Sequence, residues 1–434
     1  MFTVGIYTLG CKVAQYESEA VGEEFERLGF SLRDFSDVCD AYVINTCTVT
    51  AESDRKSRQM IRRAIKRNPR AAVAVIGCYS ERAAEEILKI DGVSLVQGTD
   101  GKLCVARRIF DLLSHKGECG IFKYPLGEGF EKMEITRAPR SRAYIKIEDG
   151  CESRCSYCAI RLARGRVRSK LPEDVIREAE ALSFRGVNEI VLTGIETGAY
   201  GKDFDFSYTL GDLIKTLSLR GRVKRIRLGS LAPELVGKDF AEKISGVKIL
   251  APHFHISMQS GSDSVLRGMK RRYTKDRAYE NIERLREIFP SAEFTTDMMV
   301  GFPGESEEDF EQSLAFIERV GFLDVHVFQY SRREGTEAAR YECQIPESVK
   351  QARSRRMIEL KNKVRDGRLK KIIDAGRTLS VIAETELEDG LYSSHADNFA
   401  EIIFKPKSCG DLRGELIKVA PVSHKNGIIY AEEI

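Results

Sequence analysis

The sequence predicts a mixed α/β protein in three parts: a doubly wound N-terminal domain, a partial (βα)6 barrel of the TIM type and a small all-β barrel at the C-terminus. Residues 1–135 alternate short apolar runs with helical patterns, which is typical of a parallel sheet with helices on both faces. The alternation resumes at residue 143 as strand–helix units, which is the pattern of a βα barrel. Residues 376–434 carry strand patterns without helices, which favours a closed β barrel.

The composition is that of a globular protein of several domains. The chain has 434 residues, and at roughly 150 residues per domain this length predicts about three domains. Lys and Arg number 69 against 66 Asp and Glu, so the net charge of +3 predicts no partner by itself. The longest apolar run, residues 71–78, is too short to cross a membrane, and the N-terminus lacks a signal-peptide pattern. We therefore expect a cytoplasmic protein with no membrane partner.

Each predicted element of the N-terminal domain follows from a change in periodicity. Apolar runs at 2–9, 40–46 and 71–77 predict three strands. The helices that follow them are expected at 17–28, 53–68 and 82–88. A segment rich in glycine, proline and mixed charge, 117–142, reads as a connector, and we place the end of this domain at residue 135.

The second domain, 136–345, is expected to hold six strands and the helices between them. The candidate strands are 143–149, 188–194, 225–231, 253–259, 293–301 and 324–331. Helices are expected to begin near Pro172, Tyr208, Pro233, Lys275 and Glu305. Residues 346–375 predict one long basic linker helix, and strands at 378–385, 399–405, 414–422 and 427–433 make up the third domain, 376–434.

The sharpest local signal is the spacing Cys151-x3-Cys155-x2-Cys158, directly after a candidate strand. Thiolates are the usual ligands of iron–sulfur clusters, and three cysteines within eight residues can hold one corner of a cluster. No fourth cysteine or histidine lies nearby in the sequence, so a cubane held there would keep one iron open for substrate. The alternative is a structural zinc site completed from elsewhere, although the usual paired Cys-x2-Cys pattern is missing.

Three further cysteines occupy equivalent positions in the N-terminal domain. Cys11, Cys47 and Cys78 each follow a candidate parallel strand, and the carboxyl ends of such strands meet at one edge of a sheet. They are therefore candidates for a shared ligand set, and the alternative is three buried small residues. We interpret the other five cysteines as packing residues: Cys39, Cys104, Cys119, Cys343 and Cys409.

The motif of Cys151, Cys155 and Cys158 and several other segments of the chain resemble those of a known family. Cys151-x3-Cys155-x2-Cys158, with Tyr157 in the aromatic position, is the signature of radical S-adenosylmethionine (SAM) enzymes. Together with TLGCKVAQYES, VINTCTVT, IGCYSE, LTGIETGAYG, HISMQSGSD, MKRRYT, TDMMVGFPGE and QYSRREGT, the whole chain resembles the methylthiotransferases, with a C-terminal segment like a TRAM domain. The segments at Cys11, Cys47 and 163–166 are most similar to the MtaB branch.

The resemblance implies an activity. Enzymes of the MtaB branch methylthiolate the adenine C-2 of N6-threonylcarbamoyladenosine at position 37 of transfer RNA. Sister branches act instead on isopentenyladenosine 37 of transfer RNA, or on an aspartate of a ribosomal protein. Two hypotheses of other classes stay open: a radical SAM enzyme that acts on another protein, and a non-catalytic iron–sulfur or zinc protein that binds RNA.

The resemblance also implies two 4Fe-4S clusters and SAM. Cys151, Cys155 and Cys158 would hold the cluster that cleaves SAM to a radical, and Cys11, Cys47 and Cys78 an auxiliary cluster that presents sulfur. Residues at the ends of barrel strands would contact the cofactors: Tyr157, Thr193, Gly194, Glu196, Gln259 and Gly301. For each of these the alternative is a plain strand-to-helix turn. The match at Glu196 is partial, because the family pattern there is richer in glycine. His253 and His255 alternate to one face of a strand, and we favour hydrogen bonds in the barrel interior over a metal site.

Basic residues are concentrated in three segments, as expected for a protein that binds RNA. Residues 55–70 hold eight Lys and Arg and no acid, 161–170 hold five, and 350–371 hold ten against two acids. Each segment could instead be a solvated helix face. The residues we expect to contact the substrate are Arg164, Arg166, Arg168 and Arg333. The expected partners are the anticodon stem-loop of transfer RNA, a reductant protein such as flavodoxin or ferredoxin, and a sulfur donor whose identity the sequence does not indicate.

Overall fold

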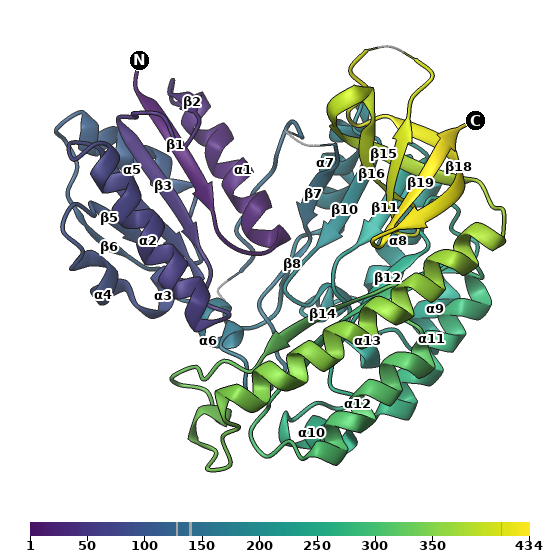
Figure 1. Ribbon diagram of the computed structural model, residues 1–434. Helices are drawn as coiled ribbons and strands as arrows, with labels where there is room; N and C mark the ends of the chain where they lie inside the picture. Colours follow the sequence, from purple (N-terminus) through teal and green to yellow (C-terminus); the bar gives the residue numbers. More distant parts are fainter. Residues whose placement is uncertain (127–128, 139–140, 409) are drawn as a thin grey trace.

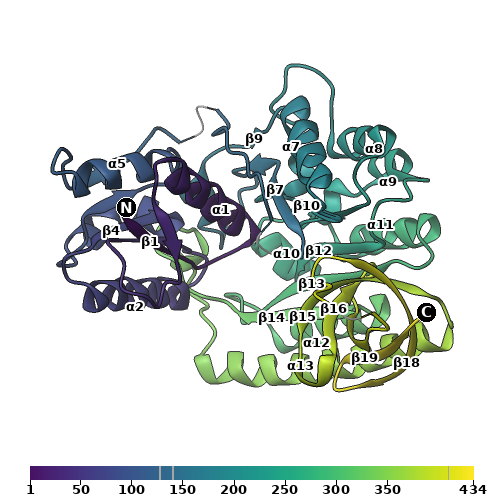
Figure 2. The same ribbon diagram turned by 90° about the horizontal axis from the view of Figure 1, so that it is seen from above.

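The computed structural model describes residues 1–126, 129–138, 141–408 and 410–434. Figure 1 shows an N-terminal α/β unit in purple and blue beside a larger βα unit in teal and green, with a yellow β barrel packed against the latter. In the view from above in Figure 2, the C-terminal barrel overlaps the long helix α13 (Glu347–Asp374), which contacts both β14 (Asp324–Gln329) of the βα unit and β18 (Leu416–Lys425) of the barrel. This is the mixed α/β fold that the sequence predicts.

The N-terminal unit is a parallel six-stranded sheet with the order β2-β1-β3-β4-β5-β6. The chain reverses its winding direction between β1 and β3, and ligands of doubly wound folds bind at such a switch point, outside the carboxyl ends of the strands. β3 and β4 are buried at every position, as expected for central parallel strands. The strands are β1 (Thr3–Thr8), β2 (Ser31–Arg33), β3 (Ala41–Thr46), β4 (Ala72–Gly77), β5 (Leu95–Gln97) and β6 (Gly120–Phe122).

The helices of this unit agree with the periodicity, although two differ at their ends. α1 begins five residues earlier than expected, directly after Cys11, because Val13, Ala14 and Tyr16 continue its buried face. The segment expected as one helix at 82–88 is two short helices, because the backbone leaves helical geometry at Ala83. β2, β5 and β6 have three residues each and were not predicted. The helices are α1 (Lys12–Arg27), α2 (Ala51–Arg67), α3 (Cys78–Arg82), α4 (Ala84–Leu88) and α5 (Cys104–Leu113).

The six predicted strands of the second unit are all present. They form two parallel three-stranded sheets, β11-β10-β7 and β12-β13-β14. The parallel bridges Ile226–Leu250 and Leu231–Ile256 connect the two sheets into one open barrel. The strands are β7 (Ala143–Lys146), β10 (Glu189–Thr193), β11 (Arg225–Leu228), β12 (His253–Gln259), β13 (Glu293–Val300) and β14 (Asp324–Gln329). A short antiparallel pair, β8 (Glu148–Asp149) and β9 (Arg168–Ser169), lies beside β7.

Helices follow the barrel strands close to the predicted starts. α7 begins at Pro172, whose fixed φ and missing N–H suit a first helical position. The expected start near Pro233 is a 3-10 turn, Pro233–Leu235, before α9. The helices are α6 (Ile160–Arg164), α7 (Pro172–Phe184), α8 (Leu210–Arg220), α9 (Lys238–Ile244), α10 (Asp263–Gly268), α11 (Lys275–Ile288) and α12 (Glu307–Val320). The remaining short 3-10 segments are Thr197–Ala199, Ala338–Arg340 and Glu388–Gly390.

The C-terminal segment is a closed five-stranded barrel with the order β15-β16-β17-β19-β18. Its strands are β15 (Leu379–Glu386), β16 (Tyr392–Ala396), β17 (Glu401–Lys405), β18 (Leu416–Lys425) and β19 (Ile428–Glu433). β16 was not predicted, because the segment YSSHA has little apolar alternation. Buried arginines of β11 join this barrel to the βα unit: Arg225 donates to Ser380 O at 2.8 Å and Arg227 to Ala396 O at 3.0 Å.

Helix α13 is less available to RNA than its charge predicts. Arg353 pairs with Glu305 at 2.7 Å, Lys361 with Asp324 at 2.9 Å, and Arg368 with Glu293 at 2.7 Å. Its basic side chains therefore largely attach the helix to the barrel. The exposed ones without an ion-pair partner among the described residues are Arg355, Lys363, Lys370 and Lys371. Within the described ranges, no helix is both long and apolar enough to cross a membrane.

Candidate functional site

The loop that carries Cys151, Cys155 and Cys158 lies between β8 and α6, at the open end of the barrel. Gly150 makes the turn into it at a φ of +82°, and a Cβ there would lie 1.8 Å from the carbonyl oxygen of Arg166. The loop closes on itself, because Cys151 N donates to Gly165 O at 3.1 Å and Cys158 N donates to Cys155 O at 3.2 Å. All three cysteine residues are partly exposed.

The structure brings Cys11, Cys47 and Cys78 to one edge of the N-terminal sheet, as their positions after parallel strands predict. Cys11 precedes α1, Cys47 follows β3, and Cys78 is the first residue of α3. A Cβ on Gly10, the neighbour of Cys11, would lie 3.9 Å from Sγ of Cys47. Burial raises the pKa of Cys47 to about 11, and the nearby thiols of Cys78 and Cys11 add to this effect. Cys78 is buried, and Cys11 is exposed.

One cavity of about 530 Å³ joins the two groups of cysteines, because Cys11 and Cys158 both line it. Its wall on the barrel side comes from the carboxyl ends of the strands, where ligands of βα barrels bind. Two of the predicted cofactor residues besides Tyr157 lie in it, Gly194 and Gln259. The other barrel residues that line it are Ile195, Ser230, Ser257, Asp297, Met299, Phe328, Gln329, Tyr330 and Ser331.

Three predicted cofactor residues do not line this cavity. Thr193 is buried at the end of β10. Glu196 accepts a hydrogen bond from Ala232 N at 3.0 Å, and burial raises its pKa to about 7. Gly301, at a φ of +74°, makes room for Lys350, since a Cβ there would lie 2.3 Å from Cγ of that lysine. The missing side chain of Gly301 therefore allows α13 to pack, and its contact with the cofactor stays a prediction.

Asp297 is a cavity residue that the sequence analysis missed. Its Oδ2 lies 3.2 Å from Nε2 of His255, and its Oδ1 lies 3.4 Å from Nδ1 of His326. Burial alone would raise the pKa of Asp297, but hydrogen bonds from the two histidines outweigh burial and hold this pKa well below its usual range. His253 and His255 both contact Thr295 Oγ1, so the predicted hydrogen-bonded interior is confirmed. The signal that could have identified Asp297 is its position in the polar segment 295–297, on the strand after the one with the alternating histidines.

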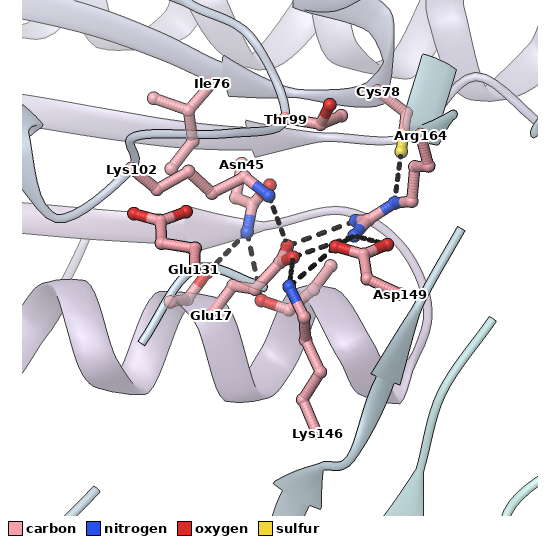
Figure 3. Close-up of polar contacts among 12 residues, drawn as sticks. Glu17, Asn45, Ile76, Cys78, Thr99, Lys102, Glu131, Lys146, Asp149 and Arg164 are labelled. Carbon is pink, nitrogen blue, oxygen red and sulfur yellow. Dashed lines mark hydrogen bonds and ion pairs between the residues drawn. The ribbon is translucent and has the colours of Figure 1, made fainter. Parts of the chain in front are cut away.

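A cluster of buried charges lies between the N-terminal unit and the barrel (Figure 3). Glu17 of α1 pairs with Lys102 at 2.7 Å, with Lys146 at 2.8 Å and with Arg164 at 2.8 Å. Asp149 completes it, 2.7 Å from Lys146 and 3.0 Å from Arg164. Burial would raise the pKa of Glu17, yet the three cations outweigh it and hold this pKa well below its usual range. The cluster therefore depends on every member keeping its charge.

Two of the arginines expected to contact transfer RNA belong to this buried region. Arg164 is 1% exposed, and its Nε donates to Sγ of Cys78 at 3.2 Å. Arg168 is buried and pairs with Asp100 at 2.7 Å. Arg333 is also buried and donates to Thr48 Oγ1 at 2.8 Å. We correct the assignments of Arg164 and Arg168, because these guanidinium groups are buried and paired with carboxylates inside the protein. Arg333 lines a cavity with Arg82 and Arg332, and its contact with the substrate stays a prediction. Arg166 is exposed and keeps its expected role as a proposal.

The packing interpretation of the five other cysteines is wrong for three of them. Cys39 is buried, but Cys104, Cys119 and Cys343 are exposed. Cys104 begins α5, and its Sγ accepts a hydrogen bond from the Tyr124 hydroxyl at 3.8 Å. The sequence pattern could not separate a buried cysteine from an exposed one at these positions. Cys409 lies outside the described residues.

The donor chemistry of both groups of cysteines fits iron–sulfur clusters. Thiolates are the standard ligands of such clusters, and a cubane is larger than a single ion. Within the described part of the chain, no three His, Cys, Asp or Glu side chains are grouped to hold a single metal ion. The cavity between the two groups, with its apolar Met299 and Phe328, has room for an additional ligand.

This fold and site define a radical SAM protein. Residues 145–317 match the radical SAM superfamily, and residues 3–98 match the uncharacterized protein family UPF0004. The radical SAM methyltransferase TsrM of Kitasatospora setae has the same fold, with a TM-score of 0.58 at 16% identity over 77% of this chain and 76% of that one. Membership of the superfamily brings SAM and a 4Fe-4S cluster as cofactors.

Comparison with curated relatives shows to which family of radical SAM proteins the chain belongs. The threonylcarbamoyladenosine tRNA methylthiotransferase MtaB of Bacillus subtilis is 38% identical over 96% of this chain and 93% of its own length. Its counterpart in Thermotoga maritima is 36% identical over 96% and 95%. A tRNA-2-methylthio-N(6)-dimethylallyladenosine synthase of Desulforamulus reducens is 30% identical over 99% and 95%. The chain belongs to the tRNA methylthiotransferase family of radical SAM enzymes.

Proposed function

We propose that this enzyme attaches a methylthio group to the adenine C-2 of N6-threonylcarbamoyladenosine at position 37 of transfer RNA. The observation that carries the proposal is the single cavity lined by Cys11 and Cys158, one residue from each group of cysteines. A transfer of sulfur to carbon requires the sulfur source and the radical source to face the same substrate atom. The relatives named for the threonylcarbamoyl substrate, at 36–38% identity, favour this substrate over dimethylallyladenosine.

We assign one 4Fe-4S cluster to Cys151, Cys155 and Cys158, and a second to Cys11, Cys47 and Cys78. When bound, the clusters and SAM supply the electron, the radical and the sulfur that adenine C-2 chemistry needs, because that carbon is unsuited to acid–base catalysis. About eight iron atoms per chain would support two clusters, and about four would contradict the second.

The chain's own residues orient the reactants and exclude water. Met299, Phe328 and Tyr157 give the cavity apolar walls, which protect a reactive intermediate from solvent. Asp297, kept ionised by two histidines, supplies a fixed negative charge in the barrel wall for hydroxyl or ammonium groups of a ligand. Gly194 and Gln259 lie at the carboxyl ends of β10 and β12, and the missing side chain of Gly194 lets its backbone approach the cofactor.

The proposed macromolecular partner is the anticodon stem-loop of transfer RNA. Support comes from the basic surface of α2, where Arg55, Lys56, Arg62 and Arg63 are exposed close to Cys47 in the sequence, and from exposed Arg166. A cytoplasmic location and a flavodoxin- or ferredoxin-type reductant fit this assignment.

Nucleoside mass spectrometry of transfer RNA from a deletion strain tests the proposal. We expect the methylthio group to disappear from threonylcarbamoyladenosine and to return when the intact chain is supplied on a plasmid. A matched plasmid with Cys11→Ala should fail to restore it. Loss of the methylthio group from isopentenyladenosine alone would assign the enzyme to the sister branch and contradict the proposal.

A further inference from the structure

Arg164 connects the two groups of cysteines. Its backbone lies at the end of α6, six residues after Cys158, whereas its side chain reaches the first residue of α3. Nε of Arg164 is 3.2 Å from Sγ of Cys78, and the two residues are 1% and 6% exposed. A charged donor therefore contacts a sulfur in an interior from which water is largely excluded.

The orientation of this donor is fixed by carboxylates. Nη1 of Arg164 lies 2.8 Å from Glu17 and 3.0 Å from Asp149, and Nη2 lies 3.1 Å from the second oxygen of Glu17. Lys102 and Lys146 hold the carboxylates in turn, at 2.7 and 2.8 Å from Glu17. With the two terminal nitrogens engaged, Nε–H points at Cys78 without any further ordering of the side chain (Figure 3).

We propose that Arg164 is a positioning residue for the auxiliary cluster: it donates a hydrogen bond to the thiolate of Cys78 and so raises the reduction potential of the cluster that Cys78 helps to hold. The inference rests on the two-cluster assignment made above. A hydrogen bond and a positive charge at a ligand sulfur favour the more negative, reduced form of a cluster. Groups outside the ligand set tune metal sites in this way.

The connection has a second effect. Because Arg164 follows the radical-type loop directly, the position of that loop and the donor to Cys78 are set by the same short helix, α6. A displacement of the loop that carries Cys158 would therefore move the hydrogen bond at Cys78.

The test uses the full chain in a background in which Cys151, Cys155 and Cys158 are replaced by alanine, so that one cluster alone is observed. In this background Arg164→Lys keeps the charge beside Glu17 and Asp149 but loses the Nε donor. Arg168→Lys is the control, because Arg168 is also buried and its hydrogen bonds run to Asp100, Gly129 O and the backbone oxygen of Arg164 rather than to a sulfur. Iron content, the EPR spectrum of the reduced cluster and its potentiometric midpoint are measured for each.

We expect Arg164→Lys to shift the midpoint to a more negative potential and to change the EPR spectrum, and Arg168→Lys to change neither. The double variant Arg164→Gln/Glu17→Gln removes one charge of each sign and should shift the midpoint in the same direction. Loss of iron in Arg164→Lys, with iron retained in Arg168→Lys and thermal unfolding unchanged, would also support the role. An unchanged midpoint, or equal effects of Arg164→Lys and Arg168→Lys, would overturn it. A background protein without any cluster would instead refute the two-cluster assignment.

Discussion

Oδ2 of Asp297 lies 3.2 Å from Nε2 of His255, and Oδ1 of the same carboxylate lies 3.4 Å from Nδ1 of His326. These three side chains come from three adjacent parallel strands, β12, β13 and β14. The carboxylate faces the cavity shared by the two groups of cysteines, so the histidines determine how much negative charge a bound ligand meets there.

The titration of His326 should report this arrangement. The hydrogen bond that His326 donates to Asp297 raises the pKa of His326 above its usual value near 6.5, despite partial burial. We expect Asp297→Asn to lower this pKa, as followed by the NMR titration of the ring proton. The stabilisation from charged His326 is complete below the unfolded pKa and is lost as pH rises through the higher folded pKa. Asp324→Asn, more distant at 3.9 Å, is the control and should have a smaller effect.

Replacement of Glu17 by glutamine should destabilise the protein strongly. The change leaves Lys102, Lys146 and Arg164 without their shared carboxylate in a site that is fully buried, and such losses cost about 3–5 kcal/mol. Urea unfolding under anaerobic conditions measures the difference. Glu52→Gln, which removes an exposed pair with Arg55, should leave the midpoint unchanged.

The same carboxylate predicts a pH dependence. Because the folded pKa of Glu17 lies below its unfolded value near 4.5, its contribution to stability is present above that value and is lost as pH falls through the folded pKa. We therefore expect the difference in unfolding free energy between wild type and Glu17→Gln to shrink in acid. A difference that grew below pH 4.5 would contradict the assignment of Glu17 as an ionised group.

Gly150→Ala should damage the loop that holds Cys151. A Cβ at this position would lie 1.8 Å from the backbone oxygen of Arg166, and the alanine would have to adopt a φ of +82°. The carbonyl is backbone, so the loop itself must move. We expect loss of SAM cleavage and about half of the iron. Gly186→Ala is the control, since its φ is +93° but nothing lies within 4 Å of the added atom. It should bear a strain of about 1 kcal/mol and retain its iron.

Arg166→Ala should weaken transfer-RNA binding. If Arg166, which is exposed beside the cysteine loop, contacts a phosphate as proposed, its loss should reduce the slope of log affinity against log salt by about one unit. Filter binding over a salt series measures this slope. Arg220→Ala is the control, because Arg220 ends α8 and so lies at the opposite face of the barrel. Equal slopes for wild type and Arg166→Ala would remove Arg166 from the interface.

The sequence predicted the strands of the barrel and the cysteine groups because both depend on local patterns. Apolar runs identify β10 and β13, and the spacing of Cys151, Cys155 and Cys158 needs no tertiary information. Burial of charge was not predictable in this way. Arg164 and Arg168 read as part of an exposed basic segment, and their partners Glu17 and Asp100 lie more than 60 residues away in the chain. The short β2, β5 and β6 were missed because three residues show no periodicity.

The two groups of cysteines also differ in when they are brought together during folding. Cys151, Cys155 and Cys158 fall within one loop closed by local hydrogen bonds, so a short nascent segment already contains all the ligands that we propose for the first cluster. Cys11, Cys47 and Cys78 meet only after β1, β3 and β4 have paired in parallel, which requires non-local contacts and is slow. We therefore expect the clusters to be loaded in a fixed order during biogenesis. The second group of cysteines should accept iron and sulfide only after the N-terminal sheet is complete.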